Sequence, residues 1–198
     1  SGLDVTIYRL GAVSGHSHTG RFNDKDAFSL KMMGCIASDM IPTAKGMLNL
    51  SPVDYVANSF VALASQPTSS GGIFHLTHSQ QVTTEAILQA ARAEGLQLRA
   101  ATETVWRTEL KRIASDQSDH PLYALASHPA ALRLGGKGAS FTNDLARNAL
   151  DGAVPEPTIS QTLLRRYIRA LADNSNSPNP LEPPMPVTTT DYDTWAWL

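Results

Sequence analysis

The stretch IYRLGAVSGHSHTG, residues 7–20, contains the strongest indication of the fold in this chain. Apolar and polar side chains alternate over residues 4–10, as they do in a β-strand. Glycines, serines and two histidines follow at once and predict a loop over residues 11–24. Open α/β sheets place their ligands just beyond the carboxyl ends of strands. The stretch therefore predicts an α/β fold with a candidate binding loop directly after a strand.

The glycines of this loop allow the backbone to approach something flat or crowded. Gly11, Gly15 and Gly20 are spaced G-xxx-G-xxxx-G, which is neither the dinucleotide fingerprint nor a phosphate-binding loop. Nearby hydroxyls and main-chain N–H groups could hold an anion. An ordinary surface turn is the alternative, and the glycine pattern alone favours it.

Periodicity predicts the remaining elements. The expected helices cover residues 27–40, 55–66 with Asp54 as N-cap, 82–95 with a Thr cap and Gly95 at the end, 104–115 with Val105, Trp106, Leu110 and Ile113 inward, and 158–172. Residues 72–78 and 96–102 are expected strands, 41–52 irregular, 67–72 a turn, and 121–134 and 140–150 further segments of the folded part.

The last expected helix has an apolar stripe that needs a partner surface. Ile159, Leu163, Tyr167 and Leu171 recur every four residues. After residue 172 prolines become frequent and periodicity is lost, which predicts a solvated tail whose end, TWAWL, could dock on the body. We expect strands and the candidate binding loop in residues 1–78. A mainly helical lobe is expected in 79–172, and a Pro-rich tail in 173–198.

Composition narrows the class of protein. The 198 residues are 42% hydrophobic with a net charge of −2, so nothing points to nucleic acid or to an anionic membrane as a partner. No apolar run reaches the roughly 20 residues needed to span a bilayer. The single cysteine excludes a disulfide framework, which makes a cytoplasmic location the default expectation. The N-terminus opens almost directly into a strand, so we expect the cut edge of a longer protein.

Other chemistries find little support. His16 and His18, or His75 and His78, could suggest a metal, but no further ligands complete a set, and a structural role is favoured. A Ser-His-Asp hydrolase would need a G-x-S-x-G elbow, which the chain lacks. Asp54 could be a catalytic carboxylate, yet its context favours a helix cap. The arginines of the last helix could contact an acidic partner, but a solvated helix face is preferred.

The order of these features resembles one family. The pieces are GLDVTIYRLGAVSGHSHTGRFNDKDAF, MIPTAKGMLNLSPVDYVANSFVALAS, GGIFHLTH and SFTNDLARNALDGAVPEPTISQTLLRRYIRALA. Together they are similar to the C-terminal part of thioester reductase domains of nonribosomal peptide synthetases, some polyketide synthases and carboxylic acid reductases. The resemblance spans residues 2–172, and YRLG-x-x-SG, TG-x-x-N-x-x-D and PVDYVA are its most specific pieces.

The resemblance implies the C-terminal portion of an extended short-chain dehydrogenase Rossmann fold with a mainly helical substrate-binding lobe. Residues 1–78 would then hold late Rossmann strands, a cofactor-side turn and a channel wall. The family uses NADPH to reduce a peptidyl or acyl thioester, carried on the phosphopantetheine arm of a carrier protein. The product is an aldehyde or alcohol, and some relatives release a cyclised product instead.

Carried over by position, the resemblance assigns two groups of residues. Arg9, Leu10, Gly11, Ala12 and Val13 would pass the nicotinamide. Ser14, His16, His18, Thr19, Gly20 and Asn23 would line the thioester channel. The resemblance also implies that PVDYVA supports that channel, with Asp54 capping its helix, and that the lobe of residues 79–172 encloses the acyl chain and faces the carrier protein.

Two signatures of the family are not in this sequence. No tyrosine is followed four residues later by lysine, and there is no G-x-x-G-x-x-G. Without them, the chain has no loop to hold the hydride donor and no side chain to donate the proton. We therefore expect the isolated chain to be inactive and to need the preceding half of the reductase. That partner would also pair the strand at residues 4–10, and without it we expect residues 1–24 to be poorly ordered, rearranged or paired with another molecule. A noncatalytic carrier-protein docking module and a sugar-nucleotide epimerase fragment are the alternatives.

Overall fold

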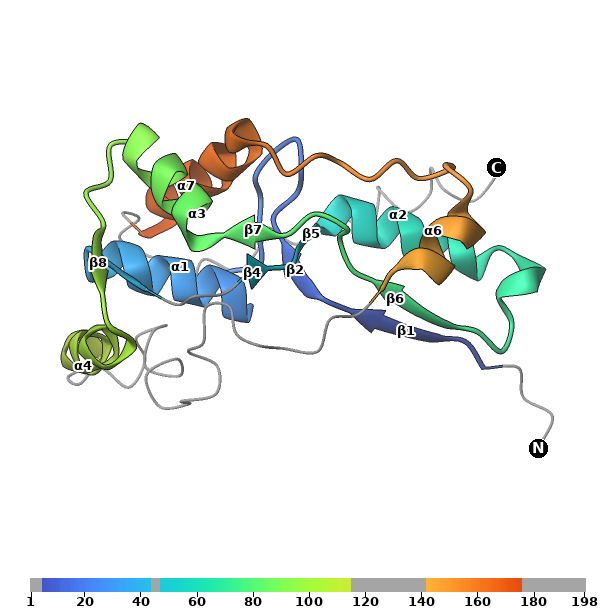
Figure 1. Ribbon diagram of the computed structural model, residues 1–198, viewed down its shortest axis with the longest axis horizontal. Coiled ribbons are helices and arrows are strands. Elements are labelled where there is room, and N and C mark those ends of the chain that lie inside the picture. The colour runs from blue at the N-terminus through green and yellow to red at the C-terminus, as the bar shows by residue number, and fades with distance from the viewer. Residues whose placement is uncertain (1–4, 44–46, 115–141, 176–198) are drawn as a thin grey trace, which may run out of the picture.

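The computed structural model describes residues 5–43, 47–114 and 142–175 (Figure 1). The extended segment of residues 7–14 forms two strands, each paired with a later strand of the chain. Strand β1 (Ile7–Leu10) pairs in parallel with β6 (Ile73–Leu76), and β2 (Ala12–Ser14) pairs in parallel with β5 (Leu50–Pro52). Gly11 separates the two pairings. A Cβ at Gly11 would lie 3.2 Å from both Asn49 Oδ1 and Thr77 Cγ2, so the crowding predicted for this glycine comes from the protein itself.

The remaining elements follow the predicted order. The helices are α1 (Ala27–Ala37), α2 (Val53–Ala64), α3 (Thr84–Ala93), α4 (Glu103–Ala114), α6 (Asp144–Leu150) and α7 (Gln161–Ser175), with a 3-10 turn at Pro67–Ser69. The other strands are β3 (Met40–Pro42), parallel to β8 (Arg99–Ala101), and β4 (Met47–Leu48), antiparallel to β7 (Val82–Thr83). These parallel pairings and covering helices are those of a partial Rossmann fold, which confirms the predicted fold class.

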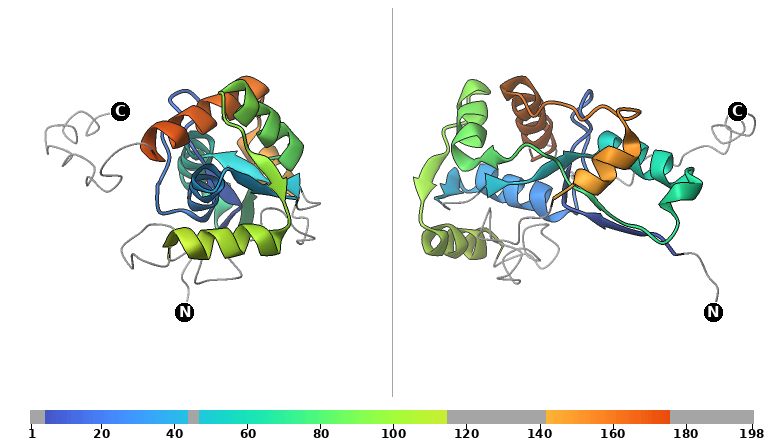
Figure 2. Two further views of the ribbon diagram at one scale, coloured as in Figure 1. Left: turned by 90° about the vertical axis from the view of Figure 1, so that its left-hand side faces the viewer. Right: turned by 45° about the vertical axis from the view of Figure 1, so that its right-hand side comes forward.

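Two apolar clusters form the interior. The larger one joins α1, α3, α4 and α7, with Trp106, Met32 and Leu110 fully buried. The smaller one joins α2, α6 and β6 through Tyr55, Leu63, Phe74, Leu76 and Leu150. The clusters cross the predicted boundary at residue 78, because α1 packs with the later helices and α6 returns to the earlier ones (Figures 1 and 2). The division at residue 78 stays a prediction.

The last helix finds its partner surface. Ile159, Leu163, Tyr167 and Leu171 are all buried, and α7 packs against α3 and α1 (Figure 2). The predicted Thr cap is also confirmed, since the Thr83 side chain accepts from the Ala86 N–H of α3. In α4, Trp106 and Leu110 point inward as predicted. Val105 is 49% exposed, so the inward orientation predicted for it is wrong.

Several predicted boundaries are wrong. Helix α1 ends at Ala37, because Asp39 takes a left-handed conformation (φ 51°) and β3 begins directly afterwards. The expected irregular segment 41–52 contains the short strands β3, β4 and β5. Helix α2 begins at Val53 with Pro52 as its N-cap, so Asp54 lies in the first turn and is not the cap. The segment 121–134 and most of the tail lie outside the described residues.

The expectation of a disordered or displaced N-terminal segment is also wrong for residues 5–24. β1 and β2 each find a partner strand within the chain, and Ser14, Gly15, Ser17 and Gly20 are buried. The parallel pairing with β6 supplies backbone partners along one edge of β1, which is enough to fix the position of this strand within the chain. Among the described residues, no helix combines the length and the apolar content needed to cross a membrane.

Candidate functional site

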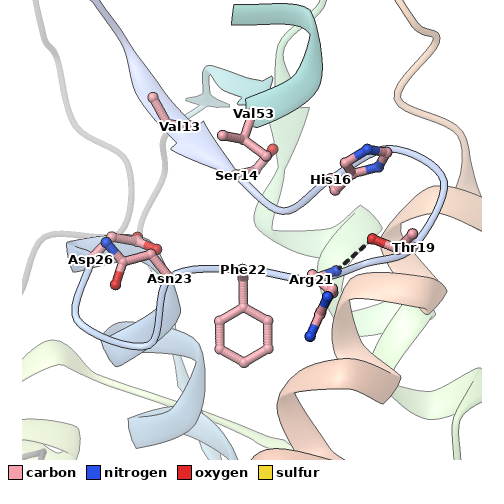
Figure 3. Close-up of a pocket in the computed structure, with 9 residues that line it drawn as sticks. All are labelled: Val13, Ser14, His16, Thr19, Arg21, Phe22, Asn23, Asp26 and Val53. Carbon is pink, nitrogen blue, oxygen red and sulfur yellow. Dashed lines mark hydrogen bonds between the residues drawn. The ribbon is translucent and has the colours of Figure 1, made fainter. Parts of the chain in front are cut away.

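The candidate site is a pocket of about 590 Å³ at the carboxyl end of β2 (Figure 3). The loop after β2 forms most of its wall, and the first residue of α2 closes one side. Its lining residues are Val13, Ser14, His16, Thr19, Arg21, Phe22, Asn23, Asp26 and Val53. The pocket therefore lies where parallel strands of an α/β sheet end, as the sequence predicts for a ligand.

The loop that forms this wall folds back on itself. The His16 N–H donates to the Arg21 carbonyl at 2.8 Å, and the Gly20 N–H donates to the His16 carbonyl at 2.9 Å. Gly20 has a φ of 75°, a conformation that other residues rarely adopt. The Thr19 hydroxyl accepts from the Arg21 N–H, as Figure 3 shows. These internal bonds make residues 16–21 a closed turn whose side chains face the pocket at His16, Thr19 and Arg21.

Asp54 anchors this turn to α2. Its carboxylate accepts the Ser17 N–H at 2.8 Å and the Ser17 hydroxyl at 2.5 Å. The position of Asp54 in the first turn of α2 also favours its negative charge, since the amino end of a helix is partially positive. Burial tends to raise the pKa of Asp54, but the hydrogen bonds from Ser17 outweigh it, so the pKa lies below its usual value.

Two consecutive residues of α7 hold the same turn from the other side. The Tyr167 hydroxyl donates to the Gly15 carbonyl at 2.6 Å, and Arg166 donates to the Ser17 carbonyl. The Ser14 hydroxyl lies 3.4 Å from the Tyr167 hydroxyl. Burial raises the pKa of Tyr167 to about 12, so the phenol stays protonated and able to donate at neutral pH.

The glycines of the loop make these contacts possible. A Cβ at Gly15 would lie 2.9 Å from Tyr167 Cε1, and one at Gly20 would lie 2.9 Å from Arg166 Cγ. The flat group that the sequence predicts beside Gly15 is therefore the Tyr167 ring. At this glycine the small residue serves the packing of the protein against its own last helix.

The opposite wall begins at α1. Asp26 is the N-cap of this helix and accepts the N–H groups of Phe28 and Ser29 at 2.7 and 3.0 Å. Phe22 packs against the larger apolar cluster, which attaches this side of the pocket to the helices of that cluster. Capping and packing thus hold the second half of the loop, as Asp54 and α7 hold the first.

The structure gathers about half of the residues predicted for the site. Val13, Ser14, His16, Thr19 and Asn23 line the pocket. Arg9, Leu10, Gly11, Ala12, His18 and Gly20 are not among its lining residues. Four further lining residues were not predicted from the sequence, namely Arg21, Phe22, Asp26 and Val53, although the first three lie within or next to the quoted loop. No local pattern predicts the anchoring roles of Ser17, Asp54, Arg166 and Tyr167.

The second histidine pair lies away from this pocket. His78 is buried, and its Nε2 lies 2.7 Å from the Pro157 carbonyl while its Nδ1 accepts the Gln80 N–H at 3.0 Å. It therefore ties the end of β6 to the segment that leads into α7, a structural role. Among the residues that the structure describes, no three His, Cys, Asp or Glu side chains come together as a metal site.

Comparison with known proteins agrees with the fold. Residues 1–60 match the family model described as male sterility protein. The chain shares 31% identity with the crystal structure of the terminal R domain from the myxalamid PKS-NRPS biosynthetic pathway, with a TM-score of 0.76 over 92% of this chain and 46% of that one. A thiolation-reductase di-domain from an archaeal nonribosomal peptide synthetase has a TM-score of 0.61 at 16% identity, over 87% of this chain and 36% of that one.

A relative found by sequence is also named a reductase. The L-2-aminoadipate reductase large subunit of Penicillium chrysogenum is 30% identical over 131 residues, which are 63% of this chain and 9% of the relative. The chain thus spans less than half of the length of each of these three proteins. The resemblance to reductase domains of nonribosomal peptide synthetases is confirmed.

Proposed function

We propose that this chain is the substrate-binding portion of an NADPH-dependent thioester reductase. The reductase would release a carrier-bound peptidyl or acyl thioester as an aldehyde, an alcohol or a cyclised product. The observation that supports this most directly is the pocket at the carboxyl end of β2. It lies in a chain whose sequence is 31% identical to that of a terminal R domain, in an alignment that covers 92% of this chain. A binding pocket at this end of the strands is where a dehydrogenase fold brings cofactor and substrate together.

The thioester would lie along the wall formed by Ser14, His16, Thr19 and Asn23. These side chains offer hydroxyl, imidazole and amide groups that can hold a carbonyl oxygen in one orientation. The apolar lining from Val13, Phe22 and Val53 would accept the acyl part. His18 and Gly20 would then contribute through the shape of the turn.

The nicotinamide end of NADPH would lie beside the same wall. Leu10 is 55% exposed and Ala12 is exposed, so the backbone between β1 and β2 has an open side next to Val13 of the pocket. Arg9, Leu10, Gly11, Ala12 and Val13 would hold the ring against this open side. NADPH, when bound there, supplies the hydride. The residues of this chain would orient the thioester carbonyl and exclude water from it.

The preceding half of the reductase would cover the bare face of the β1–β6 pair. One face packs on α2 and α6 through Phe74 and Leu76 (Figure 1). The other carries Val5, Ile7 and Ile73, which are 60%, 44% and 43% exposed. Parallel sheets are normally covered on both faces, so this apolar face is suited to receive further helices of the same domain. A phosphopantetheinylated carrier protein would be the second partner.

Nicotinamide absorbance tests this proposal. The isolated chain, mixed with NADPH and an acyl thioester, should leave the absorbance unchanged, because we propose that the nucleotide-binding parts and the proton donor lie in the preceding half. Joined to that half, it should consume NADPH. Turnover by the isolated chain would contradict the proposal that the nucleotide-binding parts and the proton donor lie in the preceding half. If the joined polypeptide binds the carrier protein without turnover, a docking module is supported instead.

A pair of matched histidine variants tests the proposed wall. In the joined polypeptide, His16→Ala should raise the KM for the thioester about tenfold, the equivalent of one good polar contact. His18→Ala removes the same side chain two residues away, outside the pocket lining, and should change this KM less than threefold, within about 0.6 kcal/mol. Equal effects of the two variants would show that the wall is wrongly assigned.

A further inference from the structure

The position of the pocket wall depends on very few contacts. Inside the turn, the N–H groups of His16, His18, Gly20 and Arg21 bond to other atoms of residues 16–21. Such bonds preserve the shape of the turn, but they cannot place it relative to the rest of the molecule. Within the part of the chain that the structure describes, side-chain hydrogen bonds from Asp54, Arg166 and Tyr167 tie residues 15–17 to other elements.

Two of these three side chains belong to α7, about 150 residues further along the chain. Tyr167 is buried and belongs to the larger apolar cluster, with Leu163, Leu164 and Ile168 around it. Through these neighbours α7 is packed on α3 and α1. The hydroxyl of Tyr167 is therefore held in place by the core of the lobe, and Gly15 is held by that hydroxyl.

The glycines show that the fit between the turn and α7 is close. Any side chain at Gly15 would meet the Tyr167 ring, and any at Gly20 would meet Arg166. These two close approaches, at Gly15 and Gly20 and to consecutive residues of the same helix, hold the loop against α7 at both of these positions. A shift of α7 would carry His16, Thr19 and Arg21 with it.

We propose that Tyr167 and Arg166 are positioning residues that set the substrate wall of the pocket, so that the last helix of the lobe determines how the thioester is held. This inference rests on the proposed function. Neither residue lines the pocket. Both act through the backbone of residues 15–17, and the effect on substrate would be one of binding more than of chemistry.

Amide hydrogen exchange in this chain tests the contact without reference to catalysis. Tyr167→Phe should raise the exchange of the Ser17 amide about tenfold, because the wall loses one of its two bonds to α7 and the Ser17 N–H bonds to Asp54 outside the turn. Tyr55→Phe is the matched control, since it removes a phenol hydroxyl from another buried tyrosine in the smaller cluster. It should leave exchange in residues 15–21 unchanged. Unchanged exchange in Tyr167→Phe would overturn the proposal.

A second pair of variants covers the case in which Tyr167→Phe does not fold. Arg166→Gln removes the bond to the Ser17 carbonyl, and Arg165→Gln removes the neighbouring arginine, which bonds Glu94 instead. The side chain of Arg165 is exposed and that of Arg166 is half-buried, so both variants should fold. Faster exchange of residues 16–20 in Arg166→Gln but not in Arg165→Gln is expected, and the same response in both variants would contradict the proposal.

Kinetics of the joined reductase separate positioning from mere stability. Tyr167→Phe should raise the KM for the acyl thioester about tenfold with kcat within about twofold, and it should leave the KM for NADPH unchanged. A merely structural role would lower the active fraction, and hence kcat, at constant KM, which would overturn the proposal. A wild-type reductase without turnover would instead contradict the proposed function, and the exchange experiments would still decide the positioning role.

Discussion

The carboxylate of Asp54 accepts both the N–H and the hydroxyl of Ser17, at 2.8 and 2.5 Å, and so joins the first turn of α2 to the pocket wall. The sequence predicts Asp54 as the cap of its own helix. The carboxylate instead satisfies a loop 37 residues earlier in the chain. Its function is to hold two segments together, which no helix-capping pattern would reveal.

Replacing this carboxylate should destabilise the chain. Asp54→Asn leaves one oxygen to accept where two are needed, and we expect a loss of about 1 kcal/mol in the free energy of unfolding, measured with urea. Asp144→Asn is a matched control, because Asp144 also lies in the first turn of its helix, with its side chain exposed. It should cost less than about 0.5 kcal/mol. Equal losses in the two variants would mean that the contact with Ser17 contributes nothing.

A methyl group at Gly15 should be poorly tolerated. Gly15→Ala brings a Cβ within 2.9 Å of both Tyr167 Cε1 and the Gly20 carbonyl, so we expect a loss of about 1–3 kcal/mol from overpacking. The control is Gly71→Ala, where φ is 75° but no atom lies within 4 Å of the new methyl. Its cost should be that of backbone strain alone, about 1 kcal/mol. Thermal or urea unfolding measures both, and a smaller loss at Gly15 than at Gly71 would contradict this packing.

The buried phenol of Tyr167 should make stability depend on alkaline pH. Its folded pKa of about 12 lies above the ordinary value of 10.0, so the folded state keeps a proton that the unfolded state releases. The stabilisation is complete below pH 10 and is lost as the pH rises towards 12. At about pH 11 the expected loss is roughly 1 kcal/mol. Urea unfolding between pH 9 and about pH 11 should show a flatter profile for Tyr167→Phe; parallel profiles would contradict this assignment.

The bare face of the β1–β6 pair should tolerate a charge in this chain. Ile73→Lys places an amine on an exposed face, and we expect a change within about 0.5 kcal/mol in the free energy of unfolding. Phe74→Ala, one residue along on the covered face, should cost about 3–5 kcal/mol. Ile73→Lys should also weaken binding to the preceding half of the reductase. A large loss of stability from Ile73→Lys alone would show that this face is covered within the chain.

Local patterns predicted most of the elements. The alternation before Gly11, the cap at Thr83 and the four-residue stripe of α7 are all features of neighbouring residues, and all three are confirmed. Local patterns failed where a partner decides the conformation. The short strands β3, β4 and β5 carry too few residues for a visible period, and they exist because β8, β7 and β2 pair with them.

The sequence by itself determined that a strand ends in a small, flexible, polar loop, because strand periodicity and glycine content are local properties of the chain. It also placed five of the pocket-lining residues within that loop. Only the tertiary structure decided what holds the loop. Asp54, Arg166 and Tyr167 reach it from segments 37 to 152 residues away, and a hydrogen bond over that separation depends on packing, which leaves no periodic trace in the sequence.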